Sequence, residues 1–204
     1  MSNSSGFSVR IFIPSGEPEA LRIVEKSNWI GQGLVFPRAL FAEARKRSEL
    51  KRTGVYVLWG QGESGQLPRV YVGEGDPVLP RLDQHAKQKD FWTHAAVFTS
   101  KDQNLNKAHI QYLEARLVML AAEAKRAELD NANVPQLPAM SEADVADAEE
   151  LTDADSQAVR ARPRDGTTLE QFGLRRQPGA GLIAAGILQP SVRITYHLAV
   201  DLLG

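Results

Sequence analysis

The chain has 204 residues, of which 43% are apolar, and it contains no cysteine. This length suits one domain of ordinary size with extensions, or two small domains. The lack of cysteine excludes disulfides and thiolate metal sites and favours a reducing compartment. No apolar run approaches the roughly 20 residues that span a membrane, and no secretion signal is visible at the start. We therefore expect a cytoplasmic protein that does not enter a membrane.

Charge is distributed unevenly along the chain. Residues 38–107 carry twelve basic and eight acidic side chains, a net charge of +4, whereas residues 108–155 carry three basic and eleven acidic, a net charge of −8. A local excess of positive charge favours a phosphate-bearing partner, although the whole chain has a net charge of −1. The basic run at residues 45–47 equally fits the solvated face of a helix, so it is not specific alone.

The first half of the chain predicts strands and short helices. Residues 8–14 alternate between apolar and other side chains, as a strand does. Acids and a proline then predict a short helix from residue 17 to about 26, and residues 37–49 predict a second helix. Runs of β-branched and aromatic residues at 54–59 and 69–74 predict a β-hairpin with a long loop.

The second half predicts more helix. Residues 78–89 have a helical pattern, residues 91–99 a strand pattern, and residues 104–129 the longest helical pattern of the chain. Prolines and asparagines at 131–139 predict a loop. Residues 141–155 are acidic and start well as a helix, because Ser141 can cap it.

These elements indicate an α+β fold with a small three-stranded antiparallel sheet and helices packed on it. Residues 1–50 are interpreted as an N-terminal extension with a strand and helices, residues 51–135 as the central domain, and residues 136–204 as an acidic segment followed by a tail. In the third strand, Trp92, His94, Ala96 and Phe98 are expected on one face. After residue 155 the composition changes to Arg, Gly, Pro and Ala, and the tail carries no functional prediction.

Two tyrosines lie in the predicted hairpin, within the tripeptides Gly54-Val55-Tyr56 and Tyr71-Val72-Gly73. Opposite residues in an antiparallel pair have a constant sum of residue numbers. A turn centred near residue 64 gives a sum of about 127–128, which places Tyr56 and Tyr71 directly opposite or one step apart. The alternative is that both are ordinary strand aromatics, which strands favour.

Three further side chains suit phosphodiester chemistry. Arg81 and His85 are four residues apart and therefore lie on one helix face, where they offer a permanent cation and a base or proton carrier. Glu114 falls near the apolar stripe of its helix, where a carboxylate costs free energy unless it is paired or binds a metal. The alternative is a glutamate at the rim that extends into solvent. Phosphodiester hydrolysis needs an activated water, charge relief at the phosphate and help for the leaving oxygen.

In order and approximate spacing, these residues resemble the GIY-YIG nuclease domain over about Thr53 to Asn133. The stretch NLNKAHIQYLEARL and the segments before the hairpin are also similar to a subgroup of bacterial GIY-YIG proteins. The family has an asparagine soon after the helix that bears its glutamate, and Asn131 and Asn133 are the two candidates for it.

The resemblance implies a metal-dependent endonuclease that hydrolyses DNA by a one-metal mechanism, with no organic cofactor. Tyr56 would accept the proton of the attacking water, directly or through His85. Arg81 would stabilise the developing charge, Tyr71 would hold a phosphate oxygen, and Glu114 would ligate Mg²⁺ or Mn²⁺. Two alternatives remain: a DNA-binding module of the same fold with chemistry lost or negligible, and a protein that is not a nuclease, such as part of a toxin or a protein-interaction scaffold.

Overall fold

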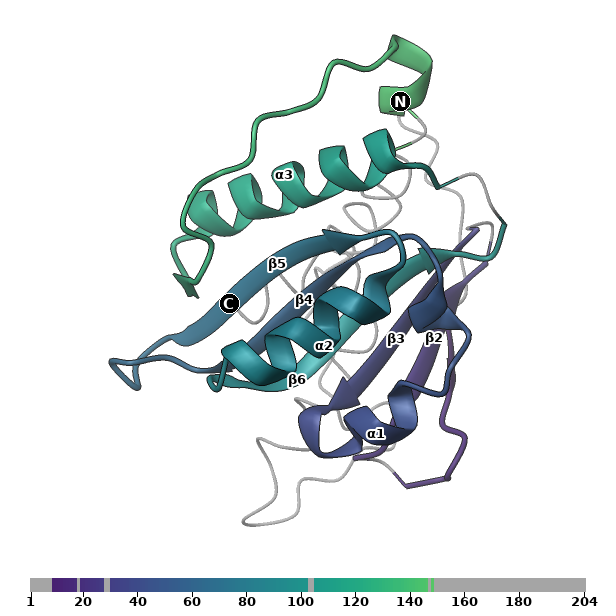
Figure 1. Cartoon of the computed structure of the whole chain (residues 1–204), viewed down its shortest axis with the longest axis vertical. Coiled ribbons are helices and arrows are strands. Elements are labelled where there is room, and N and C mark those ends of the chain that lie inside the picture. Colours follow the sequence, from purple (N-terminus) through teal and green to yellow (C-terminus); the bar gives the residue numbers. More distant parts are fainter. Residues whose placement is uncertain (1–8, 18, 28–29, 103–104, 147, 149–204) are drawn as a thin grey trace, which may run out of the picture.

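The computed structural model describes the chain except for residues 1–8, 18, 28–29, 103–104, 147 and 149–204. Seven strands form one sheet in the order β1-β2-β3-β6-β4-β5-β7 (Figure 1). All neighbouring strands are antiparallel except β5 and β7, which are parallel. The fold is therefore α+β, with a mixed and mostly antiparallel sheet.

The strands are β1 (Val9–Phe12), β2 (Arg22–Lys26), β3 (Gly31–Pro37), β4 (Gly54–Gln61), β5 (Pro68–Gly75), β6 (Trp92–Ser100) and β7 (Glu128–Leu129). The α-helices are α1 (Phe41–Ala44), α2 (Val78–Gln88) and α3 (Lys107–Ala124), and the 3₁₀ turns are η1 (Arg38–Leu40) and η2 (Glu49–Lys51). Within the described residues, no helix combines the length and apolar character that crossing a bilayer requires.

The predicted hairpin, third strand and two long helices are all present as β4, β5, β6, α2 and α3. The sheet is larger than three strands because β3 pairs with β6 and brings β1 and β2 into the same sheet. The chain N-terminal to residue 50 is thus joined to the central strands by backbone hydrogen bonds. Where the domain boundary lies stays a prediction.

Two local predictions were wrong in the N-terminal part. The helix expected from residue 17 to 26 is instead a turn followed by β2, which pairs with β1 and β3 and buries Ile23 and Val24 in the two opposite cores. Tertiary pairing here outweighs the helix-start signal of the acids and proline. The helix expected over residues 37–49 is reduced to η1 and α1, with η2 following.

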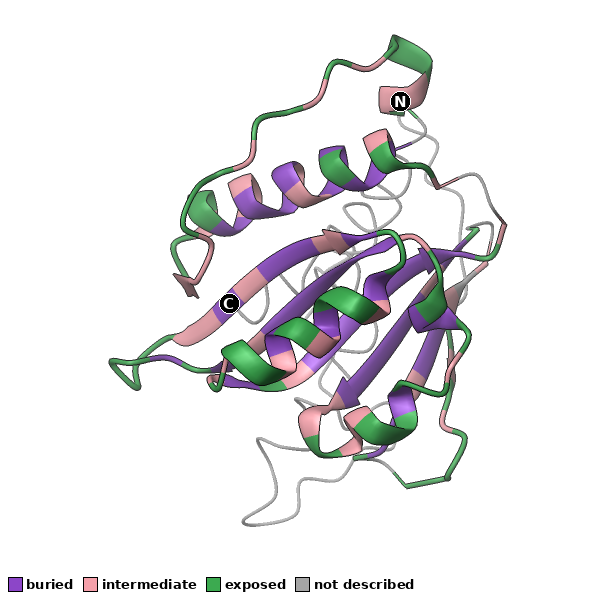
Figure 2. Ribbon diagram, viewed as in Figure 1, coloured by how far each residue is buried: buried purple, intermediate pink, exposed green. Residues whose placement is uncertain are grey.

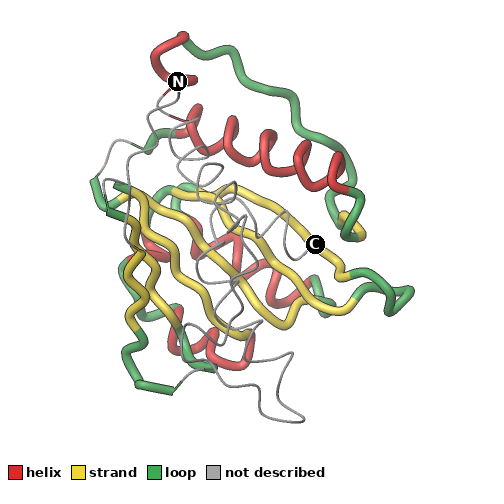
Figure 3. The backbone as a smooth tube through the Cα atoms, turned by 180° about the vertical axis from the view of Figure 1, so that it is seen from behind, coloured by secondary structure: helices red, strands yellow, loops and turns green. Residues whose placement is uncertain are grey.

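The helices cover opposite faces of the sheet, so there are two apolar cores. Helix α3 packs on the face formed by alternate residues of β4 and β5 such as Val55 and Val72. Helices α1 and α2 pack on the other face, which carries Tyr56 and Leu58. Figure 2 shows the strands buried along most of their length and each helix exposed on its outer side. Figure 3, seen from behind, shows α3 running beside the outer strand β5.

The register of the hairpin differs from the prediction by one or two residues. Gly54 pairs with Gly75, so paired residue numbers sum to 129, and Tyr56 lies opposite Gly73 while Tyr71 lies opposite Leu58. The strands continue to Gln61 and Pro68, which moves the centre of the turn. The tyrosines are therefore diagonal neighbours on one face, not directly opposite or one step apart.

The face predicted for the third strand was wrong at its first residue. Ala96 and Phe98 lie in the core under α3, but Trp92 lies in the opposite core with Ala95. Pairing with β4 skips Thr93, because Trp59 pairs with His94 and Gly60 with Trp92. This irregularity shifts the alternation of side chains by one residue, as a β-bulge does.

Candidate active site

Three aromatic rings from three elements meet on the α2 face of the sheet. Tyr56 in β4 is fully buried, and its Oη lies 2.8 Å from Nε2 of His85 in α2. The Tyr71 and His85 ring centroids are 4.7 Å apart, and the two tyrosine rings are 6.2 Å apart. The structure thus brings together three residues that lie up to 29 positions apart in the chain.

The absence of a side chain at Gly73 makes this arrangement possible. A Cβ atom at Gly73 would lie 2.5 Å from Oη and Cζ of Tyr56 and 2.9 Å from Cε1 of Tyr71. Any other residue would therefore displace one of the rings. The final glycine of the second tripeptide is needed for space beside the phenols, and not for an unusual backbone angle.

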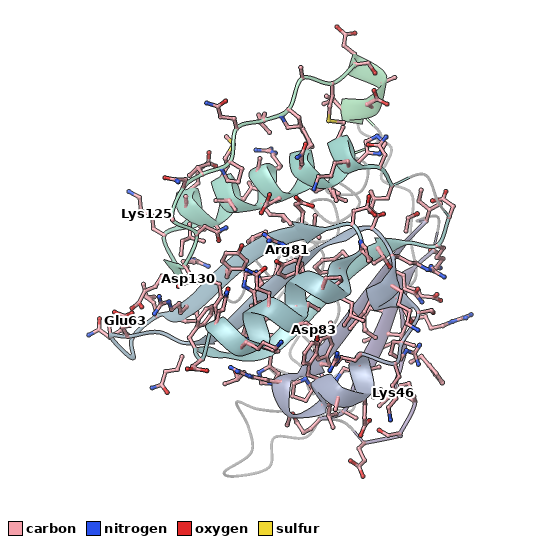
Figure 4. The ribbon with its side chains drawn as sticks, in the orientation of Figure 1. Lys46, Glu63, Arg81, Asp83, Lys125 and Asp130 are labelled. Carbon is pink, nitrogen blue, oxygen red and sulfur yellow. The ribbon has the colours of Figure 1, made fainter. Side chains whose placement is uncertain are left out.

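Arg81 lies one helical turn before His85 and is exposed. Figure 4 shows its side chain between α2 and α3, near β5. Its stem runs past Gly75, where an added Cβ would be 3.2 Å from Arg81 Cγ, and its Nη1 lies 3.4 Å from Gln84 Oε1. An exposed guanidinium next to the two phenols can bind a phosphate that approaches from solvent.

Burial and neighbouring charges perturb the acid–base properties of these groups. Burial and the nearby Tyr71 raise the pKa of Tyr56 above its ordinary value, while the charge of Arg81 opposes this rise. Burial, followed by the charges of Lys89 and Arg81, lowers the pKa of His85 to about 4. At neutral pH His85 is therefore uncharged, and Tyr56 carries its proton.

Glu114 is half-buried on α3, as its place near the apolar stripe predicted. Its side chain makes no hydrogen bond or ion pair with the described residues. Burial and the charge of Glu74 raise its pKa, whereas Arg81 and Lys107 oppose the rise. The charge of Glu114 raises the pKa of Tyr71 and that of Arg81 lowers it, so both charges lie within electrostatic range of this ring.

The carboxylates of Glu114 and Glu74 are the groups that could hold a divalent cation. Glu74 follows Val72 by two residues and so lies on the α3 face of β5; its Oε1 is 2.5 Å from Lys107 Nζ. Its Oε2 is buried and has no hydrogen-bond partner among the residues that the structure describes. Hard oxygen atoms left unsatisfied suit Mg²⁺, which keeps several waters and needs few protein ligands. No cluster of three or more potential metal-binding side chains occurs among the described residues.

The two candidate asparagines have different environments. The Asn131 side chain pairs with the open edge of β5: its Oδ1 accepts from Val72 N at 3.0 Å and its Nδ2 donates to Val72 O at 2.8 Å. Asn133 is exposed. Asn131 is therefore fixed to the backbone of Val72, the residue that follows Tyr71, while a role for either asparagine toward substrate stays a prediction.

Sequence reasoning missed a charged cluster beside Tyr71. Asp130, whose side chain is 8% exposed, accepts hydrogen bonds from both Lys89 and Arg69. Lys89 Nζ lies 4.3 Å from the centroid of the Tyr71 ring. Burial would raise the pKa of Asp130, but the bonds from Lys89 and Arg69 outweigh it and lower that pKa. The available signal was the spacing of Arg81, His85 and Lys89, four residues apart on one helix face.

No family model, curated protein or solved structure matches the chain.

Proposed function

We propose that the chain is a metal-dependent endonuclease of the GIY-YIG type, which hydrolyses DNA phosphodiester bonds with one Mg²⁺ or Mn²⁺ ion. The observation that carries this proposal is the contact between Tyr56 and His85, with Tyr71 and Arg81 beside it. All five side chains that the resemblance requires are present, including Glu114. The charges of Arg81 and Glu114 both affect the two tyrosines, so a candidate base, a permanent cation and a metal ligand lie within electrostatic range of one another.

In this mechanism Tyr56 first loses its own proton to solvent, and the phenolate then accepts a proton from the attacking water as the water oxygen forms its bond to phosphorus. The bond from phosphorus to the leaving oxygen then breaks, and that oxygen takes a proton from solvent. Arg81 donates hydrogen bonds to the non-bridging oxygens, where negative charge develops. Tyr71 orients the phosphate, because its ring is held between His85 and Lys89.

His85 is best placed to donate a hydrogen bond to Tyr56. Its Nδ1 is buried and has no hydrogen-bond partner within the described part of the chain. A buried lone pair is tolerated more readily than a buried N–H group, so the proton belongs on Nε2. A donor at Nε2 and the charge of Arg81 together stabilise the phenolate form of Tyr56, against the effect of burial.

Glu114 of α3 would hold the metal ion. The buried Oε2 of Glu74, on the α3 face of β5, is a further candidate ligand. Bound Mg²⁺ supplies charge relief at the phosphate and favours the ionised form of nearby groups. Both carboxylates must then be ionised, which the raised pKa of Glu114 opposes in the metal-free chain. Metal binding should accordingly weaken as pH falls.

The decisive experiment is cleavage of supercoiled plasmid with Mg²⁺ by the native chain and by Glu114→Ala. We expect cleavage to be abolished in the variant while DNA binding is retained, since the phosphate contacts come from other residues. Glu123→Ala is the matched control, because Glu123 is exposed on the same helix. Arg81→Lys should reduce the rate by about 10²–10³-fold, as expected when a charge-stabilising donor is misplaced. Cleavage by Glu114→Ala at the native rate would remove the site assignment.

One observation favours a second candidate, a DNA-binding module without chemistry. Tyr56 is fully buried and its pKa is raised, which keeps the phenol protonated in the chain without substrate. A module of this kind would bind DNA with or without metal and would not cut it. The plasmid assay, combined with DNA binding in the presence of a chelator, separates the two candidates.

A further inference from the structure

A cavity of about 440 Å³ lies at the end of the sheet where β4 begins and β5 and β6 end. This volume falls within the range of small-molecule sites and can hold one nucleotide. Its wall is formed by η2 and the start of β4, by the turn from β5 into α2, and by the segment after β6. The lining residues are Lys51, Arg52, Thr53, Asp76, Pro77, Ser100, Lys101, Asp102 and Leu105.

Positive charge is available at this cavity. Lys51, Arg52 and Lys101 are exposed, and the Lys51 side chain makes no hydrogen bond or ion pair within the described residues. Arg52 uses Nη1 to donate to Ser100 O at 3.0 Å, and Lys101 pairs with Glu25 at 3.2 Å. A permanent cation and an unpaired ammonium at one mouth are suited to phosphate oxygens.

The two carboxylates of the lining are occupied by neighbours. Asp76 Oδ1 accepts a hydrogen bond from Thr53 Oγ1 at 2.5 Å, and Asp102 Oδ1 accepts one from Ser100 Oγ. Hydroxyl donors reduce the repulsion that these carboxylates exert on an approaching anion. The lining itself holds three cations and two carboxylates, and Glu25 outside the lining pairs with Lys101, so Lys51 and Arg52 are the cations left to face a phosphate.

The cavity adjoins the candidate active site through the first turn of α2. Pro77 in the cavity wall is the N-cap of α2, and Arg81 follows four residues later, about 6 Å along the helix axis. The backbone of Val78 is tied to the cavity by a hydrogen bond to Arg52 O at 3.1 Å. Because neighbouring phosphates of one strand are separated by at least the axial rise of about 3.4 Å, a strand whose phosphate meets Arg81 can place a nearby nucleotide at the cavity.

We propose that this cavity is a substrate subsite, which binds a nucleotide of the DNA strand one or two positions from the phosphate at Arg81, with Lys51 and Arg52 on its phosphate. The inference rests on the proposed function and names where the substrate strand continues. It predicts that binding depends on the shape of the cavity as well as on its charge.

The test is binding of fluorescein-labelled oligothymidylate to the full chain, measured by anisotropy in the presence of a chelator so that no cleavage occurs. Lys51→Glu is compared with Lys46→Glu, which makes the same change of charge at an exposed residue outside the cavity. We expect Lys51→Glu to weaken binding about three- to tenfold more than the control. The slope of log affinity against log salt should fall by about 0.7, the value for one phosphate contact on a single strand.

A second variant tests the shape without changing the charge. Leu105 is partly exposed in the lining, and Leu105→Trp should narrow the cavity and weaken binding while the thermal unfolding midpoint stays close to that of the native chain. Equal affinities of Lys51→Glu and Lys46→Glu would overturn the subsite, and so would native affinity of Leu105→Trp.

The outcomes of this test are distinct from those of the cleavage assay. If the native chain cuts plasmid while Lys51→Glu and Lys46→Glu bind the oligonucleotide with equal affinity, the protein is a nuclease without this subsite. A chain with the expected differences in binding but no cleavage has the subsite and is a binding module.

Discussion

Tyr56 and Tyr71 have similar rings but different environments, and this difference assigns them different tasks. Tyr56 is fully buried and in contact with His85 Nε2, whereas Tyr71 is half-buried and lies against Lys89. A base must exchange a proton with water and so depends on the network that stabilises its ionised form. A phosphate-positioning group depends only on its own hydroxyl.

We therefore expect Tyr56→Phe to fold and to lose most plasmid cleavage, and Tyr71→Phe to show the smaller defect. Removal of one phenolic oxygen retains the packing of each ring, so circular dichroism should be unchanged in both variants. The pH–rate profile supplies a further measurement: His85→Ala should move it upward, because loss of the Nε2 donor raises the pKa of Tyr56 further. A Tyr56→Phe variant that cuts at the native rate with the native profile would make the tyrosine structural.

At the scale of the elements, the hairpin of β4 and β5 provides the space in which the rings meet. Gly73→Ala would place a methyl group 2.5 Å from Tyr56 Oη, so a ring must move. We expect a loss of about 1–3 kcal/mol in the free energy of unfolding, as for other overpacked cores. Gly33→Ala is the control in the same sheet, because its nearest neighbours would be at 3.5 and 3.6 Å, which is ordinary contact. Urea unfolding of both variants provides the comparison, and equal losses would contradict this account.

The segment after α3 stabilises the other edge of the hairpin. Asn131 makes two hydrogen bonds to the backbone of Val72, and the Asp130 N–H donates to Val70 O at 2.7 Å. Asn131→Ala should cost about 1–2 kcal/mol of stability and increase hydrogen exchange at the Val72 amide, because its donor and acceptor lose their partners. Asn133→Ala, at an exposed position, should change stability by less than about 0.5 kcal/mol. If the two variants behaved alike, the edge pairing of Asn131 would contribute nothing measurable.

Local patterns predicted the elements of the site better than they predicted its geometry. Strands β4, β5 and β6 and helices α2 and α3 follow from alternation and helical spacing within short windows. The pairing of Tyr56 with Gly73 could not be predicted, because the register depends on how far both strands extend into the turn. Trp92 lies on the face opposite to the predicted one because of a bulge, which forms in the pairing with β4. The spacing of His85 and Lys89 indicates the helix face on which Lys89 lies, but its contact with the distant Asp130 leaves no periodic signal.

At the scale of the whole molecule, the sheet is continuous from β1 to β7 and the candidate site lies near one edge of it. The first three strands were not expected in this sheet, because they join it through the pairing of β3 with β6, whose residues are far apart in the sequence. The runs Ile23-Val24 and Leu34-Val35-Phe36 were the available signal, since continuous apolar residues mark strands buried on both faces. The site is therefore supported by a core that extends well beyond the hairpin.

This coupling of site and core predicts how stability depends on pH. His85 is 5% exposed and has a pKa of about 4 in the folded chain, against 6.5 for an ordinary histidine. Between these values the unfolded chain binds a proton that the folded chain does not, so the free energy of unfolding falls as pH falls from 6.5 to about 4. The loss attributable to His85 is about 3 kcal/mol.

Two variants separate His85 from the other groups that titrate in this range. His85→Gln removes the titrating group and retains an amide that can donate to Tyr56, so its stability should change much less over the same pH interval. His94→Gln should retain most of the native pH dependence. His94 is half-buried and burial lowers its pKa, but His85 accounts for most of the change in the free energy of unfolding with pH. Urea unfolding at several pH values measures both. Parallel curves for the native chain and His85→Gln would mean that His85 already binds its proton in the folded state, with Arg81 and Lys89 too distant to oppose it.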